Sequence, residues 1–169
     1  LMIRLHQLRR GIVEETGRSL PLIVDPKPVN LHRFIGATVI TPNNHEASVM
    51  SGMEIRNEQQ LLAASRSIRD EIDCEAVLVT RGEAGMALLQ ADDRLLTIPT
   101  RAKEVYDVTG AGDTVVATLA LGLATGCSVL DAAELANHAA GIVVGKIGTA
   151  SVHADELCGA LQSEPTGGQ

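Results

Sequence analysis

The 169-residue chain is poor in aromatic side chains: it has one Phe, one Tyr and no Trp. Proteins that hold single-stranded nucleic acid stack its bases on aromatic rings, so this composition argues against a nucleic-acid partner. The formal net charge of −7 argues further against a general polyanion binder. With 45% hydrophobic residues the chain can still bury a core, which must be aliphatic and rich in alanine. Any phosphate ligand must therefore be bound locally, by backbone N–H groups and a few basic side chains.

Cysteines are few, and long hydrophobic runs are absent. The three cysteines are far apart and lack the spacing of a metal site: Cys74, Cys127 and Cys158. Reduced thiols in a cytoplasmic protein are the simple interpretation. The first ten residues lack the architecture of a signal peptide. The longest uncharged stretch, between Asp113 and Asp131, is short for a bilayer span and contains threonines and glycines, which favours a buried globular helix and no membrane partner.

Short apolar strands alternate with helical patterns along the chain. The predicted helices span residues 3–16, 44–51, 57–73, 112–125, 128–146 and 154–161. The predicted strands span residues 22–24, 37–41, 76–80, 85–90 and 94–98, the last two forming a hairpin through Asp92 and Asp93. This order predicts an α/β fold whose sheet is largely parallel and covered by helices.

Some boundaries rest on individual residues. Gly17 ends the first helix, and Leu5, Leu8 and Ile12 are predicted to share one face of it. Asn57 caps the third helix, whose buried face is predicted to carry four aliphatic residues: Leu61, Ala64, Ile68 and Ile72. The chain opens with a helix and lacks the strand that should precede it. It is therefore either an unusual small α/β domain or the C-terminal half of a larger one.

The stretch Asp107 to Thr114 reads D-V-T-G-A-G-D-T and leads into an apolar helix. Gly110 and Gly112 flank Ala111, and such small residues let the backbone turn tightly and let an anion approach the peptide N–H groups. The helix that follows points its unsatisfied N–H groups and positive dipole end at the same place, as a phosphate or transferring phosphoryl group requires. Asp113, in the first turn, could take a proton from an attacking hydroxyl. The alternative is a glycine-rich turn with Asp113 as a simple helix cap.

A second motif, T-P-N-N-H-E at residues 41–46, stands where a strand gives way to a helix. Its carboxylate and amide, Glu46 and Asn43, could organise Mg²⁺-bound water around nucleotide phosphates. Their separation of three residues is also that of a capping box, and the spacing alone leaves both interpretations open.

Two further segments have the character of a ligand site. Residues 77–85 form a buried strand that ends in a polar turn with Thr80 and Gly82, and open α/β sheets bind ligands at such strand ends. An ordinary turn between strands is an equal alternative. Residues 136–141 place Asn137 in a helix of small residues. Close helix packing is the simpler interpretation there, although an asparagine at this position could also contact an adenine edge.

The motifs together resemble the ribokinase-like, or phosphofructokinase B-type, carbohydrate kinases. The resemblance covers about residues 1–160 and rests on six segments in the expected order: D-P-K (25–27), T-P-N-x-x-E (41–46), V-T-R-G-E-x-G (79–85), V-Y-D-V-T-G-A-G-D (105–113), A-N-x-A-A-G (136–141) and K-x-G-T (146–149). Within that family these segments are most similar in sequence to those of the D-glycero-β-D-manno-heptose-7-phosphate kinase domain of ADP-heptose synthesis. The implied fold is a three-layer α/β/α sandwich with a mostly parallel sheet and one antiparallel hairpin.

The resemblance implies roles for the loop before the fourth predicted helix. Asp113 would be the general base that deprotonates a sugar hydroxyl, and the N–H groups of Gly110, Ala111 and Gly112 would form the anion hole for the phosphoryl group of ATP. The implied reaction converts heptose 7-phosphate to heptose 1,7-bisphosphate, a step in the synthesis of the lipopolysaccharide core.

The same resemblance implies the nucleotide and metal contacts. Asn43 and Glu46 would lie near the ATP phosphates and Mg²⁺, and Asp107 and Thr109 would help to hold a monovalent cation such as K⁺. Three residues would line the nucleotide pocket: Thr80, Gly82 and Asn137. Lys27 is a candidate for a phosphate contact. The implied partners are a small sugar phosphate and ATP, and the parent protein is expected to be a homodimer.

The chain departs from the family pattern in one major respect. The N-terminal half of family members carries most of the sugar-binding residues and the strands of the dimer contact, and neither is found here. We therefore expect residues 1–162 to be the C-terminal, nucleotide-binding and catalytic portion of such a kinase, followed by a flexible tail at 163–169. The portion alone could be inactive. A kinase for another sugar or a nucleoside, a non-catalytic nucleotide-binding fragment and a purely structural domain are the competing hypotheses.

Overall fold

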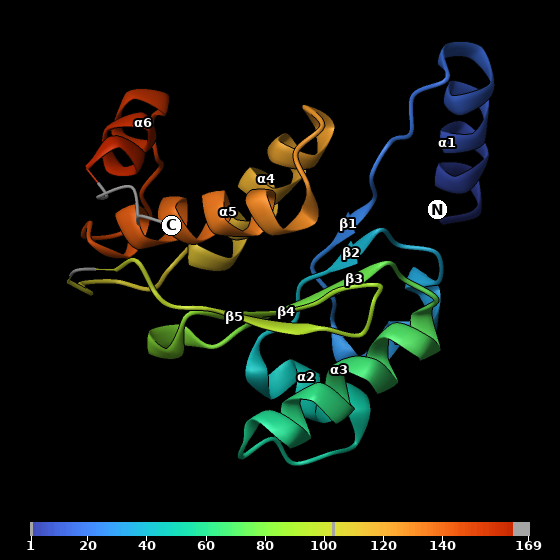
Figure 1. Ribbon diagram of the computed structural model, residues 1–169, viewed down its shortest axis with the longest axis horizontal. Coiled ribbons are helices and arrows are strands. Elements are labelled where there is room, and N and C mark those ends of the chain that lie inside the picture. Colours follow the sequence, from blue (N-terminus) through green and yellow to red (C-terminus); the bar gives the residue numbers. More distant parts are fainter. Residues whose placement is uncertain (1, 103, 164–169) are drawn as a thin grey trace. The chain divides into compact units, whose positions relative to one another are not determined.

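The computed structural model describes residues 2–102 and 104–163 of the chain (Figure 1). The described helices and strands follow one another in the predicted order. The helices are α1 (Met2–Thr16), α2 (Asn44–Ser51), α3 (Glu58–Ile72), α4 (Ala111–Ala124), α5 (Val129–Val144) and α6 (Ala154–Gln162). The strands are β1 (Ile23–Val24), β2 (Val39–Ile40), β3 (Ala76–Thr80), β4 (Met86–Leu89) and β5 (Leu95–Ile98). Two short 3₁₀ helices, η1 (Pro28–Phe34) and η2 (Gly82–Ala84), were not predicted.

The strands form one sheet in the order β1-β2-β3-β4-β5. The first three strands run parallel, with Ile23 opposite Val39 and Val39 opposite Ala76. The last two are joined by a tight turn in which Gln90 N donates to Arg94 O at 3.0 Å. The predicted α/β class with a mostly parallel sheet and a hairpin is therefore confirmed. In the described part of the chain, no helix is long and apolar enough to cross a membrane.

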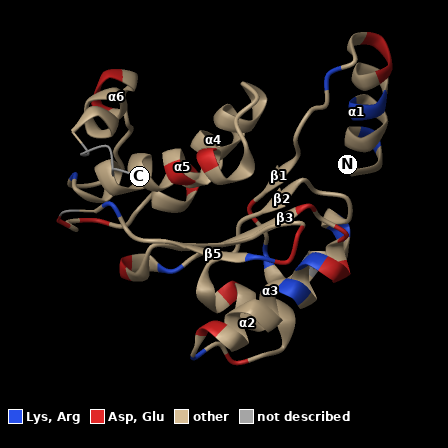
Figure 2. Ribbon diagram, in the orientation of Figure 1, with Lys and Arg blue, Asp and Glu red and all other residues tan. Residues whose placement is uncertain are grey.

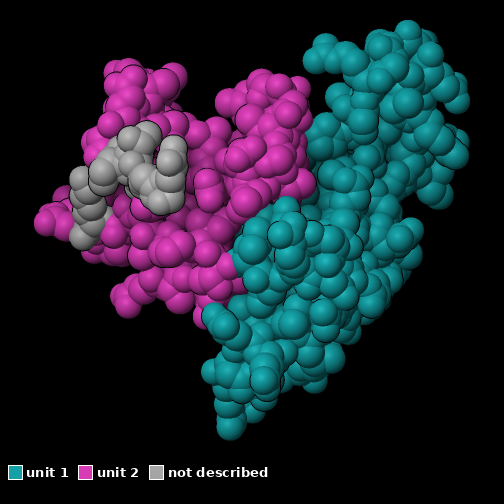
Figure 3. Space-filling view, viewed as in Figure 1, with its two compact units in different colours: residues 1–79, 88–96 teal, residues 80–87, 97–169 magenta. Residues whose placement is uncertain are grey.

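The chain divides into two compact units, coloured separately in Figure 3. Unit 1 comprises residues 1–79 and 88–96, and unit 2 comprises residues 80–87 and 97–169. In the predicted tail, only Ser163 belongs to the described residues; its N–H donates to Gly159 O at 3.2 Å and ends α6. Residues 164–169 of that tail lie outside the described part.

The core of unit 1 combines the buried face of α3 with buried strands. The four predicted residues of α3 are at most 2% exposed, and β2 and most of β3 are fully buried. Asn57 caps α3 as predicted, because its side chain accepts from Gln60 N at 2.9 Å. The backbone joins these elements directly, since Gly36 N donates to Ile72 O at 2.8 Å and Ala76 N donates to Thr38 O at 3.1 Å.

Helix α1 differs from the sequence prediction in how it is held. It ends at Thr16, and Gly17 adopts the left-handed conformation expected of a helix stop. No described residue of α1 is buried, however, and Leu8, on the predicted apolar face, is 59% exposed. Polar contacts attach the helix instead: Arg9 donates to Leu20 O at 2.7 Å, to Gly36 O and to Thr38 Oγ1.

The core of unit 2 is the contact between α4 and α5, which lie side by side in Figure 1. Small residues allow the helices to approach closely: a Cβ atom at Gly122 of α4 would lie 2.9 Å from the Cβ of Ala132 of α5. Most of the interior of α5 is alanine or valine. The predicted helix 128–146 begins at its Ser128 cap but ends at Val144, two residues early.

Substitution of Gly85, between η2 and β4, should strongly destabilise the protein. Its φ of +76° with ψ of −128° is available only to glycine, and an added Cβ would run into backbone atoms of residues 98–100. We expect Gly85→Ala to lower the free energy of unfolding by about 3 kcal/mol or more, because strain and overpacking add.

Gly52→Ala is the matched control for this prediction. Gly52 is also left-handed, with φ of +66°, but has open space around its α-carbon. Its substitution should cost only about 1–2 kcal/mol. Urea unfolding of both variants makes the comparison, and equal losses would show that the contact with residues 98–100 contributes nothing.

Candidate functional site

One face of α5 holds the segment that runs from β5 to α4. Asn137 donates through Nδ2 to Pro99 O at 2.6 Å. At Gly141 the segment comes so close that an added Cβ would lie 2.9 Å from the carbonyl carbon of Arg101. Val144 O accepts from the N–H groups of Tyr106 and Asp107, at 2.8 and 3.3 Å. Because these α5 residues are spaced i, i+4 and i+7, they share one face of the helix.

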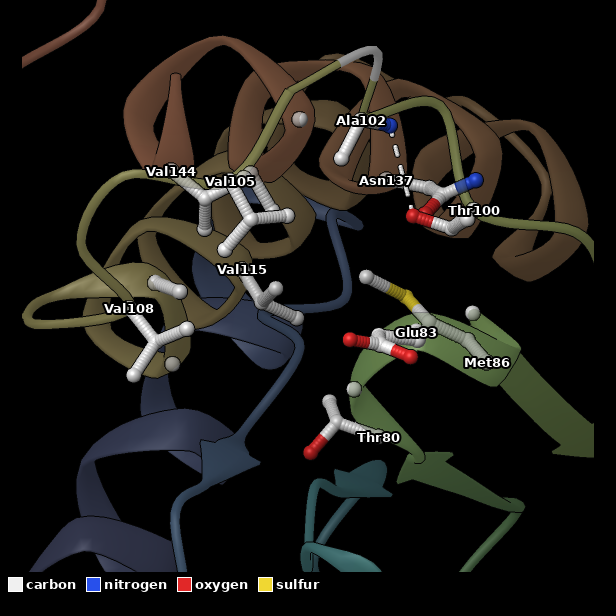
Figure 4. Close-up of a pocket in the computed structure, with 16 residues that line it drawn as sticks. Thr80, Glu83, Met86, Thr100, Ala102, Val105, Val108, Val115, Asn137 and Val144 are labelled. Atoms are coloured by element: carbon white, nitrogen blue, oxygen red, sulfur yellow. Dashed lines mark hydrogen bonds between the residues drawn. The ribbon is translucent and has the colours of Figure 1, made fainter. Parts of the chain in front are cut away.

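A cavity of about 450 Å³ opens beside this face (Figure 4). All of its lining residues belong to unit 2, and they come from the end of β3, η2, β4, the segment 99–108, α4 and α5. They are Thr80, Gly82, Glu83, Gly85, Met86, Thr100, Ala102, Val105, Val108, Ala111, Gly112, Val115, Asn137, Ala140, Gly141 and Val144. The structure therefore brings the predicted nucleotide residues Thr80, Gly82 and Asn137 to one cavity.

The cavity wall is largely apolar, with a few polar groups at separate places. Four valines form one part of it, while Thr100 and Asn137 lie together on another side in Figure 4. Thr80 and Glu83 come from the strand side. An apolar pocket with a few oriented polar groups is typical of a small-molecule site.

Basic side chains contribute nothing to the described cavity wall. No Lys or Arg is among the residues that line it, and Figure 2 shows α4 and α5 as tan ribbons with a few acidic residues. At the described wall an anion would therefore meet backbone N–H groups, and the few basic side chains that the composition also led us to expect do not line the cavity.

The loop Asp107–Gly110 supplies such groups. Asp107 Oδ1 accepts from Thr109 N at 2.9 Å, which closes a tight turn. Gly110, with φ of +81°, is the left-handed residue that starts α4. Ala111 N donates to Val108 O at 3.2 Å, but no described residue accepts from the N–H groups of Gly110 and Gly112. Two of the three predicted anion-hole donors are thus unsatisfied, and Gly112 reaches the cavity wall.

The carboxyl group of Asp107 is held in its charged form. Hydrogen bonds from Thr109, through its side chain and then its backbone, and from the Gly148 backbone lower the pKa of Asp107 below its ordinary value. The structure therefore brings the two predicted cation ligands Asp107 and Thr109 together, and it places the loop after α5 beside them. Thr149 also lies there, with its Cγ2 3.8 Å from the position of a Cβ at Gly110.

Asp113 stands in the first turn of α4 with an exposed carboxylate. Among the described residues it has no hydrogen bond or ion pair, and the capping residue of α4 is Gly110 without a side-chain cap. The alternative of Asp113 as a helix cap is therefore not realised. Asp113 is not part of the cavity wall, although its neighbours Ala111 and Gly112 are.

The predicted Mg²⁺ residues Asn43 and Glu46 belong to unit 1 and form a complete capping box of α2. Asn43 Oδ1 accepts from Glu46 N at 2.8 Å, and Glu46 Oε2 accepts from Asn43 N at 2.9 Å. Lys27 Nζ lies 3.5 Å from Glu46 Oε1 and 3.8 Å from Asp25 Oδ2. The structural alternative for this motif is thus realised. Within the described residues, no three His, Cys, Asp or Glu side chains form a group that could hold a metal.

Several cavity residues were not predicted as site residues. Glu83, Gly85, Ala140 and Gly141 stand inside quoted motifs, so the motifs themselves were the available signal. Val105 and Val108 likewise stand inside the quoted motif 105–113. The remaining ones are mostly apolar and lie in segments without a distinctive pattern: Met86, Thr100, Ala102, Val115 and Val144. The hydrogen bond from Asn137 to Pro99 joins positions far apart in the sequence, and no local spacing could reveal it.

Gly141→Ala should push the segment 99–102 away from α5. In an open helix position the change from Gly to Ala stabilises by up to about 1 kcal/mol. At Gly141 the added methyl would lie 2.9 Å from rigid backbone, which costs about 1–3 kcal/mol. We expect a net loss of stability in urea unfolding, whereas Gly159→Ala in α6, which meets open space, should gain. A gain at both positions would show that the close approach does not constrain the segment.

Residues 13–156 match the family model "pfkB family carbohydrate kinase". The chain is 51% identical over 162 residues to the bifunctional protein HldE of Paramagnetospirillum magneticum, which covers 96% of this chain and 32% of that protein. The chain thus spans about a third of the length of the curated relatives that it matches.

Solved structures show the same fold. Ribokinase from Arabidopsis thaliana, complexed with ribose and ATP, is 25% identical, with a TM-score of 0.79 over 91% of this chain and 51% of that one. Phosphofructokinase-2 from Escherichia coli, in complex with potassium, is 19% identical, with a TM-score of 0.76 over 94% of this chain and 52% of that one; this likeness shows the fold alone. The ribokinase-like fold expected from the motifs is confirmed, and the chain belongs to the pfkB family of carbohydrate kinases.

Proposed function

We propose that residues 1–162 form the nucleotide-binding and catalytic portion of a kinase that transfers a phosphoryl group from ATP to a sugar hydroxyl. One observation carries the proposal: among the described residues the N–H groups of Gly110 and Gly112 have no acceptor, Gly112 lines a largely apolar cavity, and the carboxylate of Asp113, which follows directly, has no hydrogen bond or ion pair to a described residue. Family membership and the ATP complex of the ribokinase neighbour support it.

The nucleotide is proposed to occupy the cavity of unit 2. Its base and ribose suit the apolar wall and the polar groups of Thr80, Gly82 and Asn137. Nδ2 of Asn137 donates one of its two N–H groups to Pro99 O, so the second N–H and the amide oxygen remain for a ligand. The dipole of α4 favours the phosphates near Gly110 and Gly112.

In the proposed reaction, the sugar hydroxyl oxygen forms a bond to the γ-phosphorus while the bond from that phosphorus to the bridging oxygen of ADP breaks. Asp113 takes the proton of the hydroxyl. The free N–H groups at the start of α4 are proposed to stabilise the negative charge on the transferring group, because fixed backbone donors need no reorganisation during the reaction.

The chain offers candidate residues for the two cations. Mg²⁺ would neutralise charge on the ATP phosphates, and Asn43 and Glu46 are proposed to act on it through bound water, because Asn43 Oδ1 and Glu46 Oε2 are engaged in the capping box and Glu46 Oε1 faces Lys27. Asp107 and Thr109 are proposed to help hold a monovalent cation such as K⁺, for which the charged carboxylate of Asp107 is suited. The potassium complex of the fold neighbour is compatible with this role.

The proposed substrate is heptose 7-phosphate and the product heptose 1,7-bisphosphate, in ADP-heptose and lipopolysaccharide core synthesis. The identity of 51% to the bifunctional protein HldE supports this choice, as do the sequence motifs V-D-P-K and V-Y-D-V-T-G-A-G-D. We further propose that the parent protein is cytoplasmic and homodimeric. A kinase for another sugar or a nucleoside would use the same residues, and a substrate panel with ATP separates these cases.

Asp113→Asn should lower kcat for phosphoryl transfer by about 10²- to 10⁴-fold, because a general base contributes that much. The dissociation constant for ATP should stay within about twofold, since Asp113 lies outside the cavity wall. Kinetics with heptose 7-phosphate and calorimetry with ATP, on the full-length protein, measure the two effects. Asp155→Asn, an equally exposed carboxylate in the first turn of α6, is the control and should change neither. ATP binding without turnover in the unaltered protein would identify a non-catalytic nucleotide binder instead.

Glu46→Gln separates the helix cap from the proposed cation role. Gln also fits a capping box, so stability in urea should change by less than about 0.5 kcal/mol. The lost charge should raise the Mg²⁺ concentration needed for half-maximal activity by about threefold or more. An unchanged Mg²⁺ requirement would leave Glu46 with a purely structural role. Gln60→Glu, which alters charge at the cap of α3, is the control and should leave the Mg²⁺ requirement unchanged.

A further inference from the structure

Lys146 follows the end of α5, and its side chain contacts both the loop after α5 and the next helix, α6. Its Nζ lies 2.7 and 2.9 Å from Oε1 and Oε2 of Glu156, in the first turn of α6. The same ammonium donates to Ser151 O at 2.8 Å. One side chain therefore ties the end of α5 to the middle of the loop and to the next helix.

Glu156 is held in its charged form at this junction. The hydrogen bond from Lys146 is the largest cause that lowers its pKa below the ordinary value, and His153 N adds a second bond at 2.8 Å. The side chains of Lys146 and Glu156 are 31% and 35% exposed. The pair is thus partly shielded from solvent, where a charge-assisted hydrogen bond contributes more than on an open surface.

The loop 145–153 has few apolar contacts of its own. Ile147 is 88% exposed, and Gly148 has φ of +78° with open space around it. Segments without buried apolar contacts open easily unless polar interactions restrain them. The Lys146–Glu156 pair and the bond to Ser151 are therefore polar contacts that can restrain the described loop.

This loop backs the segment Asp107–Gly110. Thr149 lies beside Gly110, with its Cγ2 3.8 Å from the position of a Cβ there, and the Gly148 backbone is near enough to the Asp107 carboxyl group to help lower its pKa. At the start of the loop, Val144 O accepts from the N–H groups of Tyr106 and Asp107. Displacement of the loop would consequently remove support from the residues that precede the anion-binding end of α4.

We propose that Lys146 and Glu156 are positioning residues: their ion pair keeps the loop 145–153 against Asp107–Gly110 and so fixes the direction of the free N–H groups at the start of α4. The catalytic consequence rests on the function proposed above. Those N–H groups act on charge that develops during transfer, so a loosened loop should reduce kcat while leaving the KM for ATP nearly unchanged. An ion pair that merely fastened α6 would alter neither constant.

Two variants remove the pair in different ways, and two serve as controls. Lys146→Met keeps the aliphatic stem without the charge, and Glu156→Gln keeps an acceptor for His153 N. Lys146→Arg retains the charge and should restore both readouts. Asp92→Asn breaks the exposed Asp92–Arg94 pair in the turn between β4 and β5, so it tests for a general effect of losing a surface ion pair.

Amide hydrogen exchange and steady-state kinetics of the full-length protein test the proposal. In Lys146→Met and Glu156→Gln, exchange at Asp107, Thr109 and Gly148 should accelerate about three- to tenfold, and kcat should fall by a similar factor. The KM for ATP should stay within about twofold of the unaltered protein. Lys146→Arg and Asp92→Asn should match the unaltered protein in both measurements.

Two results would overturn the positioning role. One is faster exchange confined to α6, with unchanged exchange at Asp107 and Thr109. The other is an unchanged kcat in both charge-removing variants of an active kinase. If the unaltered protein transfers no phosphoryl group, the proposed function fails, and exchange at Asp107 and Thr109 alone then decides whether the pair positions the loop.

Discussion

The close approach of an extended segment to one face of α5 is the constraint on which the site depends. Residues 99–102 and 104–107 lie against this face because Gly141 leaves room for the backbone and Asn137 and Val144 bind it at either end. That arrangement forms one wall of the cavity and delivers the chain to Gly110 in the position from which α4 starts. A larger residue at 141 or a lost amide at 137 would act on the ligand site through the backbone, without any contact to a ligand.

Local sequence signals predicted much of the fold. The caps at Asn43, Asn57 and Ser128 placed the starts of three helices because each side chain bonds a backbone N–H within its own turn. Other features depend on tertiary contacts, which local sequence patterns do not show. Leu8 lies on an apolar stripe yet stays exposed, since Arg9 attaches α1 through polar bonds. Helix α5 ends at Val144 with Gly145 as its C-cap, and the side chain of Lys146 beyond it binds the loop and α6.

Part of the candidate site could also be predicted from the sequence, and part could not. Glycines and carboxylates with fixed local spacing were visible in the sequence, and the loop Asp107–Gly110 indeed forms a turn with unsatisfied N–H groups. The capping box of Asn43 and Glu46 shows the limit of such reasoning, since one spacing serves a helix end and a cation equally well. The apolar wall of the cavity has no sequence signature. Its members come from separate segments that only the folded chain brings together.

The central claim is that the start of α4 receives phosphate while the adjoining cavity receives the rest of a nucleotide. Amide chemical-shift mapping with Mg²⁺ and a non-hydrolysable ATP analogue, on the full-length protein, tests it most directly. The account predicts the largest shifts at Gly110 and Gly112, together with shifts at Thr80, Gly82 and Asn137. Saturable binding that leaves the amides of Gly110 and Gly112 unshifted would contradict it, as would the absence of binding.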